Sequence, residues 1–155
     1  MMNDKNLTER PLMLAIKYLS HRPRTVYEMS AYIKKKGFPK DIIRQVITIL
    51  LEENYLNDKK FTKLYIDSMV RNRPKSKFAL GFELKRKGVN QSIIEPALES
   101  YDDMGLAIRA VTPKIKIWKN LDTEKFKKKL INFLKYRGFN YEICIQTLKT
   151  IEKKM

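Results

Sequence analysis

The segment KKKGF at residues 34–38 recurs as KRKGV at residues 85–89 and as KYRGF at residues 135–139. The glycines of these three segments are 51 and then 50 residues apart. Apolar residues stand at matching offsets before and after each glycine. A period of this size is typical of one supersecondary unit used several times along a chain. The sequence therefore predicts three tandem repeats, with function expected on a repeated surface rather than in one pocket.

Each repeat has the pattern of three short helices. In the first repeat, Pro23 ends the first helix, because proline cannot continue it. Thr25 and Glu28 have the spacing at which each side chain caps the backbone N–H of the other, at the start of the second helix. Gly37 ends that helix, and Pro39 opens the third helix in its first turn. No sustained alternating pattern competes with the helical spacing, so we predict an all-α fold.

The other two repeats follow the same plan. In the second repeat, Pro74 marks the helix break, and the next helix is expected to pack through Phe78, Leu80, Phe82 and Leu84. In the third repeat, Pro113 is expected to end or kink the first helix. Such repeats bury their apolar faces on their neighbours, which predicts an elongated row of modules, either straight or curved. The predicted boundaries are residues 1–57, 58–103 and 104–155.

The charge of the chain narrows the class of partner. Its 155 residues include 33 Lys and Arg against 17 Asp and Glu, a net charge of +16, which favours a polyanionic or strongly acidic partner.

The start of the chain is polar and lacks the apolar core of a signal peptide. No stretch approaches the roughly 18 uncharged residues of a membrane span. We therefore expect a cytoplasmic protein with no membrane partner.

The residues that catalysis requires are scarce. His21 lies in a polar segment between helices, and Cys144, the one cysteine, lies in a helical apolar stripe without a histidine near it in the sequence. Paired carboxylates occur only where helices end or begin, where capping explains them. The glycines are isolated, so there is no Gly-rich phosphate loop. We expect no enzymatic activity, no cofactor and no metal site.

Basic residues recur at one place in the repeat, the last turn of its second helix. The helix dipole favours cations there by roughly 0.3–1 kcal/mol each, without any partner. The dipole does not account for the further cations in the loop before this helix, and this excess indicates phosphate neutralisation with little sequence preference. The candidate binding residues are Arg22, Arg24, Lys34, Lys35, Lys36, Arg71, Arg73, Lys75, Lys77, Lys85, Arg86, Lys87, Lys127, Lys128, Lys135 and Arg137.

Aromatic residues lie between these cations, and their role stays open between base stacking and burial in the core. Trp118 is the clearest example, because it is surrounded in the sequence by Lys114, Lys116 and Lys119. It is either a stacking residue or part of a packed crossover.

A series of short segments in a fixed order carries a family resemblance. They are Ala15 to Leu19, Arg22 to Thr25 with Glu28, Lys36 to Phe38, Asn54 to Asp58 with Phe61 and Tyr65, Leu84 to Val89, and Phe133 and Leu134 with Arg137 to Phe139. In this order, and with the three-repeat period, the chain resembles the RecX regulatory proteins of bacteria over nearly its whole length. It departs from them at Pro74 to Lys77, where the family usually has a glycine in the loop.

The resemblance implies a modulator without catalysis of its own. RecX-like proteins bind the RecA recombinase, lie along the groove of its filament on single-stranded DNA, and inhibit strand exchange, ATP hydrolysis and the co-protease role of the filament. By this resemblance, the candidate cations contact DNA or recombinase in DNA repair and recombination, the DNA being single-stranded or double-stranded. We also expect the chain to act as a monomer. Two alternatives stay open: a stand-alone helical DNA-binding or architectural protein, and an interaction module for an acidic protein.

Overall fold

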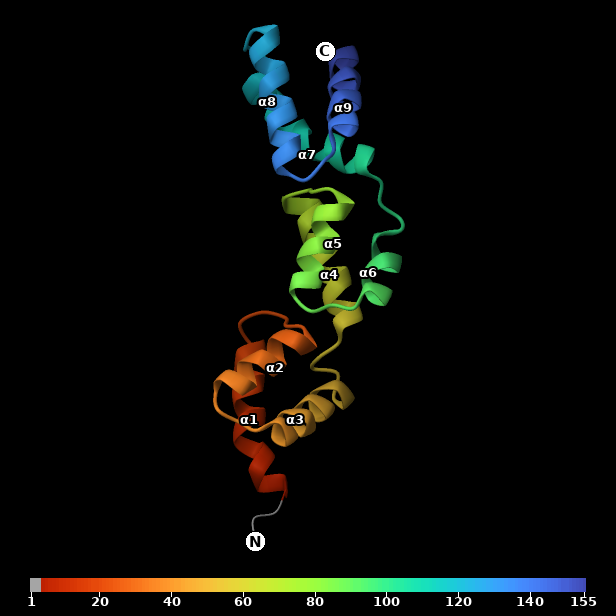
Figure 1. Cartoon of the computed structure of the whole chain (residues 1–155). Coiled ribbons are helices and arrows are strands. Elements are labelled where there is room, and N and C mark those ends of the chain that lie inside the picture. The colour runs from red at the N-terminus through yellow and green to blue at the C-terminus, as the bar shows by residue number, and fades with distance from the viewer. Residues whose placement is uncertain (1–3) are drawn as a thin grey trace. The chain divides into compact units, whose positions relative to one another are not determined.

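The computed structural model describes residues 4–155, with side chains from residue 7 onward, and all regular structure in this part is α-helical (Figure 1). The all-α prediction is therefore confirmed for the described residues. The helices of the first predicted repeat are α1 (Asp4–Leu19), α2 (Val26–Lys35) and α3 (Lys40–Glu52). Those of the second are α4 (Asp58–Asn72), α5 (Lys77–Arg86) and α6 (Gln91–Leu98). Those of the third are α7 (Asp103–Trp118), α8 (Thr123–Tyr136) and α9 (Tyr141–Lys154).

The described residues form two compact units. Unit 1 contains the described residues up to Lys63 together with Leu84–Ile93, and unit 2 contains Leu64–Glu83 together with Ile94–Met155. Within unit 1, the helices α1, α2 and α3 pack on one another. Within unit 2, α7, α8 and α9 do the same. Each unit thus combines the helices of a terminal repeat with part of the second repeat.

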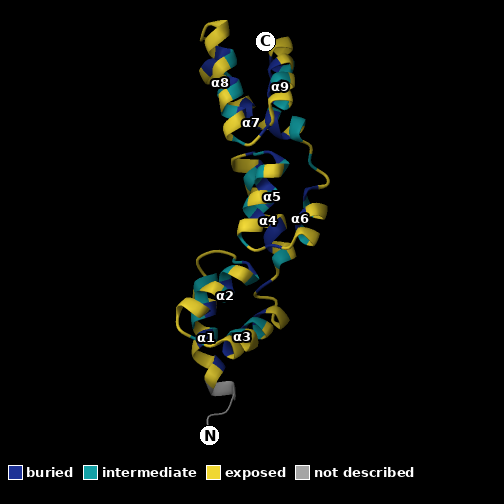
Figure 2. Ribbon diagram, viewed as in Figure 1, coloured by how far each residue is buried: buried dark blue, intermediate teal, exposed yellow. Residues whose placement is uncertain are grey.

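The helical spacing of apolar residues places the core of unit 1. Met29 and Ile33 on α2 face Val46 and Leu50 on α3 and Ala15 on α1 in one buried cluster. Each of these side chains is at most 1% exposed, and buried positions alternate with exposed ones along each helix (Figure 2). Burying an aliphatic side chain of this size contributes roughly 1.5–3 kcal/mol. The apolar stripe therefore holds the three helices together and leaves their cations on the outer faces.

Two of the three predicted helix ends of the first repeat are confirmed, and the third is off by one residue. The Glu28 N–H donates to Thr25 Oγ1 at 3.0 Å, and the Thr25 N–H donates to Glu28 Oε1 at 3.1 Å, so the capping box is complete. Gly37 follows α2 with a φ of +96°, a conformation that glycine adopts without steric cost. Pro39 is the N-cap of α3, so this helix begins one residue later than predicted, at Lys40.

The structure rules out one alternative at each of two places in the third repeat. The helix α7 continues through Pro113 to Trp118, so of the two expected outcomes at the proline, an end or a kink, the end is wrong. Trp118 is 9% exposed and meets Phe133 edge to face, with ring centroids 5.5 Å apart. This contact holds the end of α7 against α8. Trp118 is thus a packing residue, and base stacking by its ring is excluded.

The expected apolar stripe of α5 is only half right. Leu80 and Leu84 are fully buried, whereas Phe78 is 79% exposed and Phe82 is 54% exposed. Residues four apart lie on one face of a helix, so the two leucines share one face and the two phenylalanines share another. The phenylalanine rings stack on each other, with centroids 6.4 Å apart. The pair is an exposed aromatic patch rather than core.

Candidate nucleic-acid interface

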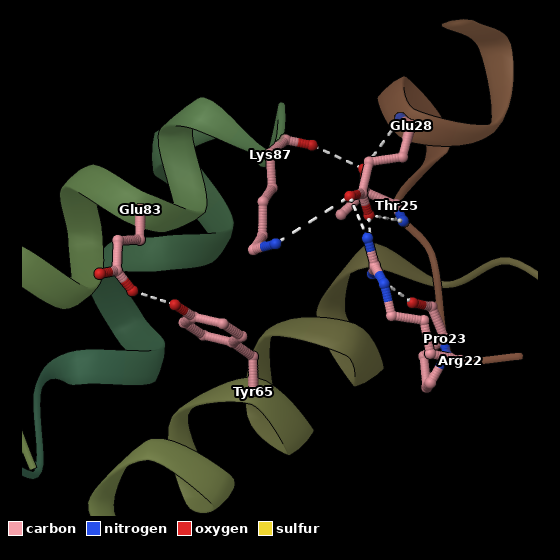
Figure 3. Close-up of polar contacts among 7 residues, drawn as sticks. All are labelled: Arg22, Pro23, Thr25, Glu28, Tyr65, Glu83 and Lys87. Atoms are coloured by element: carbon pink, nitrogen blue, oxygen red, sulfur yellow. Dashed lines mark hydrogen bonds and ion pairs between the residues drawn. The ribbon is translucent and has the colours of Figure 1, made fainter. Parts of the chain in front are cut away.

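We call residues 34–38, 85–89 and 135–139 the first, second and third basic turns. The start of the second helix in one repeat is held by the basic turn of the next repeat, and unit 1 contains the first example (Figure 3). The Thr25 hydroxyl, which accepts from the Glu28 N–H, donates to the Lys87 carbonyl at 2.6 Å. The Val26 N–H donates to Asp58 Oδ1 at 2.9 Å, and burial raises the pKa of that carboxyl. Thr25 is fully buried and uses both its donor and its acceptor. The second basic turn therefore contributes to packing.

Unit 2 repeats this arrangement with the third basic turn. The Ser76 N–H donates to the Arg137 carbonyl at 3.1 Å, and the Lys77 N–H donates to Asp103 Oδ1 at 2.9 Å. The Arg137 guanidinium adds a hydrogen bond from Nη1 to the Pro74 carbonyl at 3.0 Å. In both units, the matching N–H groups of Val26 and Lys77 thus donate to an aspartate that begins a later helix, Asp58 on α4 and Asp103 on α7. The carbonyls of Lys87 and Arg137 accept from the Thr25 hydroxyl and from the Ser76 N–H.

The first basic turn differs from the other two. A Cβ built on Gly37 would meet no atom within 4 Å, whereas a Cβ built on Gly88 would lie 2.1 Å from the Cβ of Tyr27. The turns that look alike in sequence therefore have different surroundings, and Lys34, Lys35 and Lys36 beside Gly37 are all exposed.

Glu28 engages two of the predicted cations in unit 1. Arg22 Nη2 lies 2.8 Å from Glu28 Oε2, and Lys87 Nζ lies 4.0 Å from the same oxygen (Figure 3). Burial opposes ionisation of Glu28, but the hydrogen bonds from Arg22 and Thr25 and the charge of Lys87 outweigh it, so the pKa of Glu28 is lowered. Arg22 and Lys87 therefore stabilise the start of α2.

Glu28→Gln is expected to weaken the pH dependence of stability. Because the folded pKa of Glu28 lies below its ordinary value of 4.5, the carboxylate stabilises the fold above that pH, and this contribution is lost as the pH falls through the folded pKa. Glutamine keeps an acceptor for the cap but removes the charge. Urea unfolding should show a loss of about 1 kcal/mol at pH 7 and a smaller loss at pH 3. An equal loss at both pH values would contradict this role.

A second carboxylate engages a predicted cation in unit 2. Glu83 forms an ion pair with Lys75. It also accepts a hydrogen bond from the hydroxyl of Tyr65 (Figure 3). Burial, together with the adjacent Glu83 carboxylate, raises the pKa of Tyr65. Lys75 and Tyr65 are therefore held by contacts inside the protein, and base stacking does not account for Tyr65.

A stack of rings and cations lies on the first repeat. The guanidinium carbon of Arg24 is 3.7 Å from the ring centroid of Tyr18. Tyr18 in turn stacks on Tyr32 with centroids 3.8 Å apart and planes within 3° of parallel. Lys36 Nζ lies 5.4 Å from the centroid of Tyr32. The stack fixes Arg24 and the two tyrosines in place, so these rings serve packing.

Most of the remaining candidates lie at the surface. Lys77 and Lys127 are half-buried, whereas the exposed candidates without an acidic partner among the described contacts are Lys34, Lys35, Lys36, Arg71, Arg73, Lys85, Arg86, Lys128 and Lys135. Exposed cations keep their charge available to a polyanion. These exposed cations form the candidate surface for binding nucleic acid.

One pocket in unit 2 gathers cations that the sequence alone did not bring together. It has a volume of about 460 Å³, and its basic lining residues are Arg71, Arg109, Lys114 and Arg137. Arg109 and Lys114 were not among the predicted site residues. Their only signal was a run of cations without carboxylates along the later part of α7. The pocket forms where the end of α4, the middle of α7 and the end of α8 pack together. The spacing of residues along single helices does not predict this packing.

Cys144 and His21, whose residue types often serve in catalysis, lie in different surroundings. Cys144 is fully buried, as its apolar stripe predicted, and burial raises the pKa of its thiol. His21 is exposed. Among the described residues, there is no group of three or more His, Cys, Asp or Glu side chains arranged to hold a metal ion. Within the same part of the chain, no helix is both long enough and apolar enough to cross a membrane.

Models of the RecX family match the chain in two places. The model of the first RecX three-helix domain matches residues 13–50, and that of the second matches residues 57–98. The regulatory protein RecX of Chlorobium limicola is 34% identical over 134 residues, which are 86% of this chain and 84% of that protein. That of Prosthecochloris aestuarii is 35% identical over 141 residues, 91% and 93% of the two chains.

Other relatives are longer. The regulatory protein RecX of Bacillus pumilus is 33% identical over 138 residues, and the chain spans 52% of its length. Among solved structures, the crystal structure of RecX from Lactobacillus salivarius superposes with a TM-score of 0.78 over 96% of this chain and 98% of that one. Its sequence identity is 21%, so this likeness shows the fold. The two RecX models together match more than half of the chain, and RecX relatives that are 34–35% identical align over most of their own length. The chain therefore belongs to the RecX family of regulatory proteins.

Proposed function

We propose that the chain binds RecA recombinase filaments on single-stranded DNA and inhibits strand exchange, ATP hydrolysis and co-protease activity. Membership of a family of regulatory proteins carries this proposal. The proposal makes the chain a non-catalytic regulator of DNA repair and recombination that acts as a monomer in the cytoplasm.

The surface chemistry supports a polyanionic partner. The net charge is +16, and most of the predicted cations are exposed without an acidic partner among the described contacts. Cations that neutralise backbone phosphates release counterions, which gives affinity with little sequence preference. The exposed Phe78 and Phe82 pair adds ring surface of the kind on which unpaired bases stack. Cations together with exposed rings favour single-stranded DNA over a duplex, whose bases are already stacked.

In the proposed mechanism, binding on the filament opposes the addition of recombinase monomers. Basic turns that recur about 50 residues apart offer contacts at intervals, so one chain can engage more than one site on a repeating filament. Contacts with the DNA backbone and with acidic recombinase surface both use the same exposed cations. Inhibition then follows from occupancy of the filament, with no bond made or broken by the chain.

The test is to add the purified chain to RecA filaments on single-stranded DNA while ATP turnover and filament length are measured. We expect ATP turnover to fall and filaments to shorten at chain concentrations well below that of RecA. Insensitivity of both readouts, combined with binding of duplex DNA, would instead support a stand-alone DNA-binding protein. Binding to neither DNA nor filament would refute both.

A further inference from the structure

The pocket in unit 2 that contains Arg71, Arg109, Lys114 and Arg137 has an unusual charge balance. All its charged lining residues are basic, and the rest of its lining is Asn72, Pro74, Ala110, Thr112 and Pro113. Its volume of about 460 Å³ lies within the range of sites that take small molecules. Four cations converging without a carboxylate repel one another, and an anion in the pocket would remove that repulsion.

Two of these cations lie near one ring. The guanidinium carbon of Arg137 is 4.6 Å from the ring centroid of Phe133, and Lys114 Nζ is 6.0 Å from the same centroid. Arg137 is also fixed by its hydrogen bond to the Pro74 carbonyl. Its guanidinium is therefore preorganised, which lowers the entropy cost of binding an anion.

Arg137 has unused binding capacity. Its Nε is buried and has no hydrogen-bond partner among the described residues. Burial lowers the pKa of its guanidinium, and the positive charge of Arg73 adds to this effect. A buried donor without a partner costs free energy.

We propose that this pocket binds a phosphate group of a nucleic-acid backbone, with Arg71, Arg109, Lys114 and Arg137 as its ligands. Arginine matches the paired oxygens of phosphate with two parallel N–H donors. The lining has no aromatic residue, so the pocket is expected to hold phosphate and sugar while the base points away. Binding should therefore not depend on base identity. The inference deepens the proposed function and rests on it for the source of the phosphate.

The test compares two double variants of the full chain that remove the same charge. R71Q/R109Q removes two exposed cations from the pocket, and K149Q/K153Q removes two exposed cations from α9 outside it. Fluorescence anisotropy with a labelled single-stranded oligonucleotide of mixed sequence measures affinity over a range of salt concentrations. Because all four positions are exposed, both variants should keep the melting temperature of the wild type, which serves as the folding control.

We expect R71Q/R109Q to weaken oligonucleotide binding roughly tenfold near 0.1 M salt, and to lower the slope of log affinity against log salt by about 1.4. K149Q/K153Q should change affinity less than about twofold, because charges that do not contact the oligonucleotide are largely screened at that salt concentration. Equal losses of affinity in the two variants, or no loss in R71Q/R109Q, would overturn the proposal that this pocket binds phosphate.

Two further probes separate the alternative ligands. A nucleoside triphosphate that binds the wild type as tightly as the oligonucleotide, with the same loss in R71Q/R109Q, would reassign the phosphate site to free nucleotides and overturn the nucleic-acid source. If R71Q/R109Q lost binding of a poly-glutamate peptide but kept binding of the oligonucleotide, the pocket would not be a phosphate site. None of these assays contains recombinase, so failure of the pocket leaves the filament assay of the proposed function unaffected.

Discussion

Gly88→Ala is expected to destabilise the protein by about 3 kcal/mol or more. Gly88 has a φ of +86°, which costs an L-residue roughly 1–2 kcal/mol. A Cβ at this position would also lie 2.1 Å from the Cβ and 2.5 Å from the Cγ of Tyr27. The Tyr27 Cβ is fixed to the backbone of α2 and cannot rotate away. The turn would have to separate from the start of α2, which would break the hydrogen bond from Thr25 to Lys87.

Gly37→Ala is the matched control. Gly37 has a similar φ of +96°, but its new Cβ would meet no atom within 4 Å. Only the backbone cost of roughly 1–2 kcal/mol applies there. Urea unfolding followed by circular dichroism measures both variants, with the change in midpoint as the readout. Similar losses for Gly88→Ala and Gly37→Ala would show that the contact with Tyr27 does not hold the second basic turn in place.

Charge reversal on the first two basic turns is expected to weaken inhibition of RecA ATP turnover by two orders of magnitude or more. The variant K34E/K35E/K85E/R86E replaces four exposed cations that have no acidic partner among the described contacts. Each lost phosphate contact weakens binding, and each new carboxylate adds repulsion. Lys87 is left unchanged, because it is paired with Glu28 and its carbonyl accepts from Thr25. The readout is the concentration of chain that halves ATP turnover.

The control variant K59E/K60E/K149E/K153E reverses the same amount of charge at exposed positions outside the predicted surface. It should keep inhibition within about tenfold of the wild type, since charges beyond a Debye length are largely screened. The melting temperatures of both variants verify the fold. Equal losses of inhibition would mean that net charge alone drives binding, and the basic turns would have no special role.

Local chemistry explains which parts of the fold could be predicted from the sequence. The capping box of Thr25 and Glu28 and the turn at Gly37 depend on residues a few positions apart, and both predictions are confirmed. The exposure of Phe78 and the continuation of α7 through Pro113 depend on tertiary packing. The spacing of apolar residues indicates a helix, but it does not show which face of that helix another element covers.

The site was harder to predict than the helices. The sequence identified the recurring cations, but it could not separate Lys87 and Arg137, which pack between repeats, from Lys34 and Lys85, which are exposed. That difference arises from partners more than 50 residues away in the sequence. The role of the predicted cations in binding stays a prediction, which the charge-reversal variant addresses.

The dependence of one repeat on the next has a consequence for synthesis on the ribosome. Translation begins at the N-terminus, so Val26 emerges 32 residues ahead of Asp58, and Thr25 emerges 62 residues ahead of Lys87. At a typical rate of roughly 5–20 residues per second, the nascent first repeat waits several seconds with these groups solvated. Its helices can form early, but the start of α2 gains its final hydrogen bonds only when most of the second repeat has been made. The order of translation thus delays the completion of the first repeat.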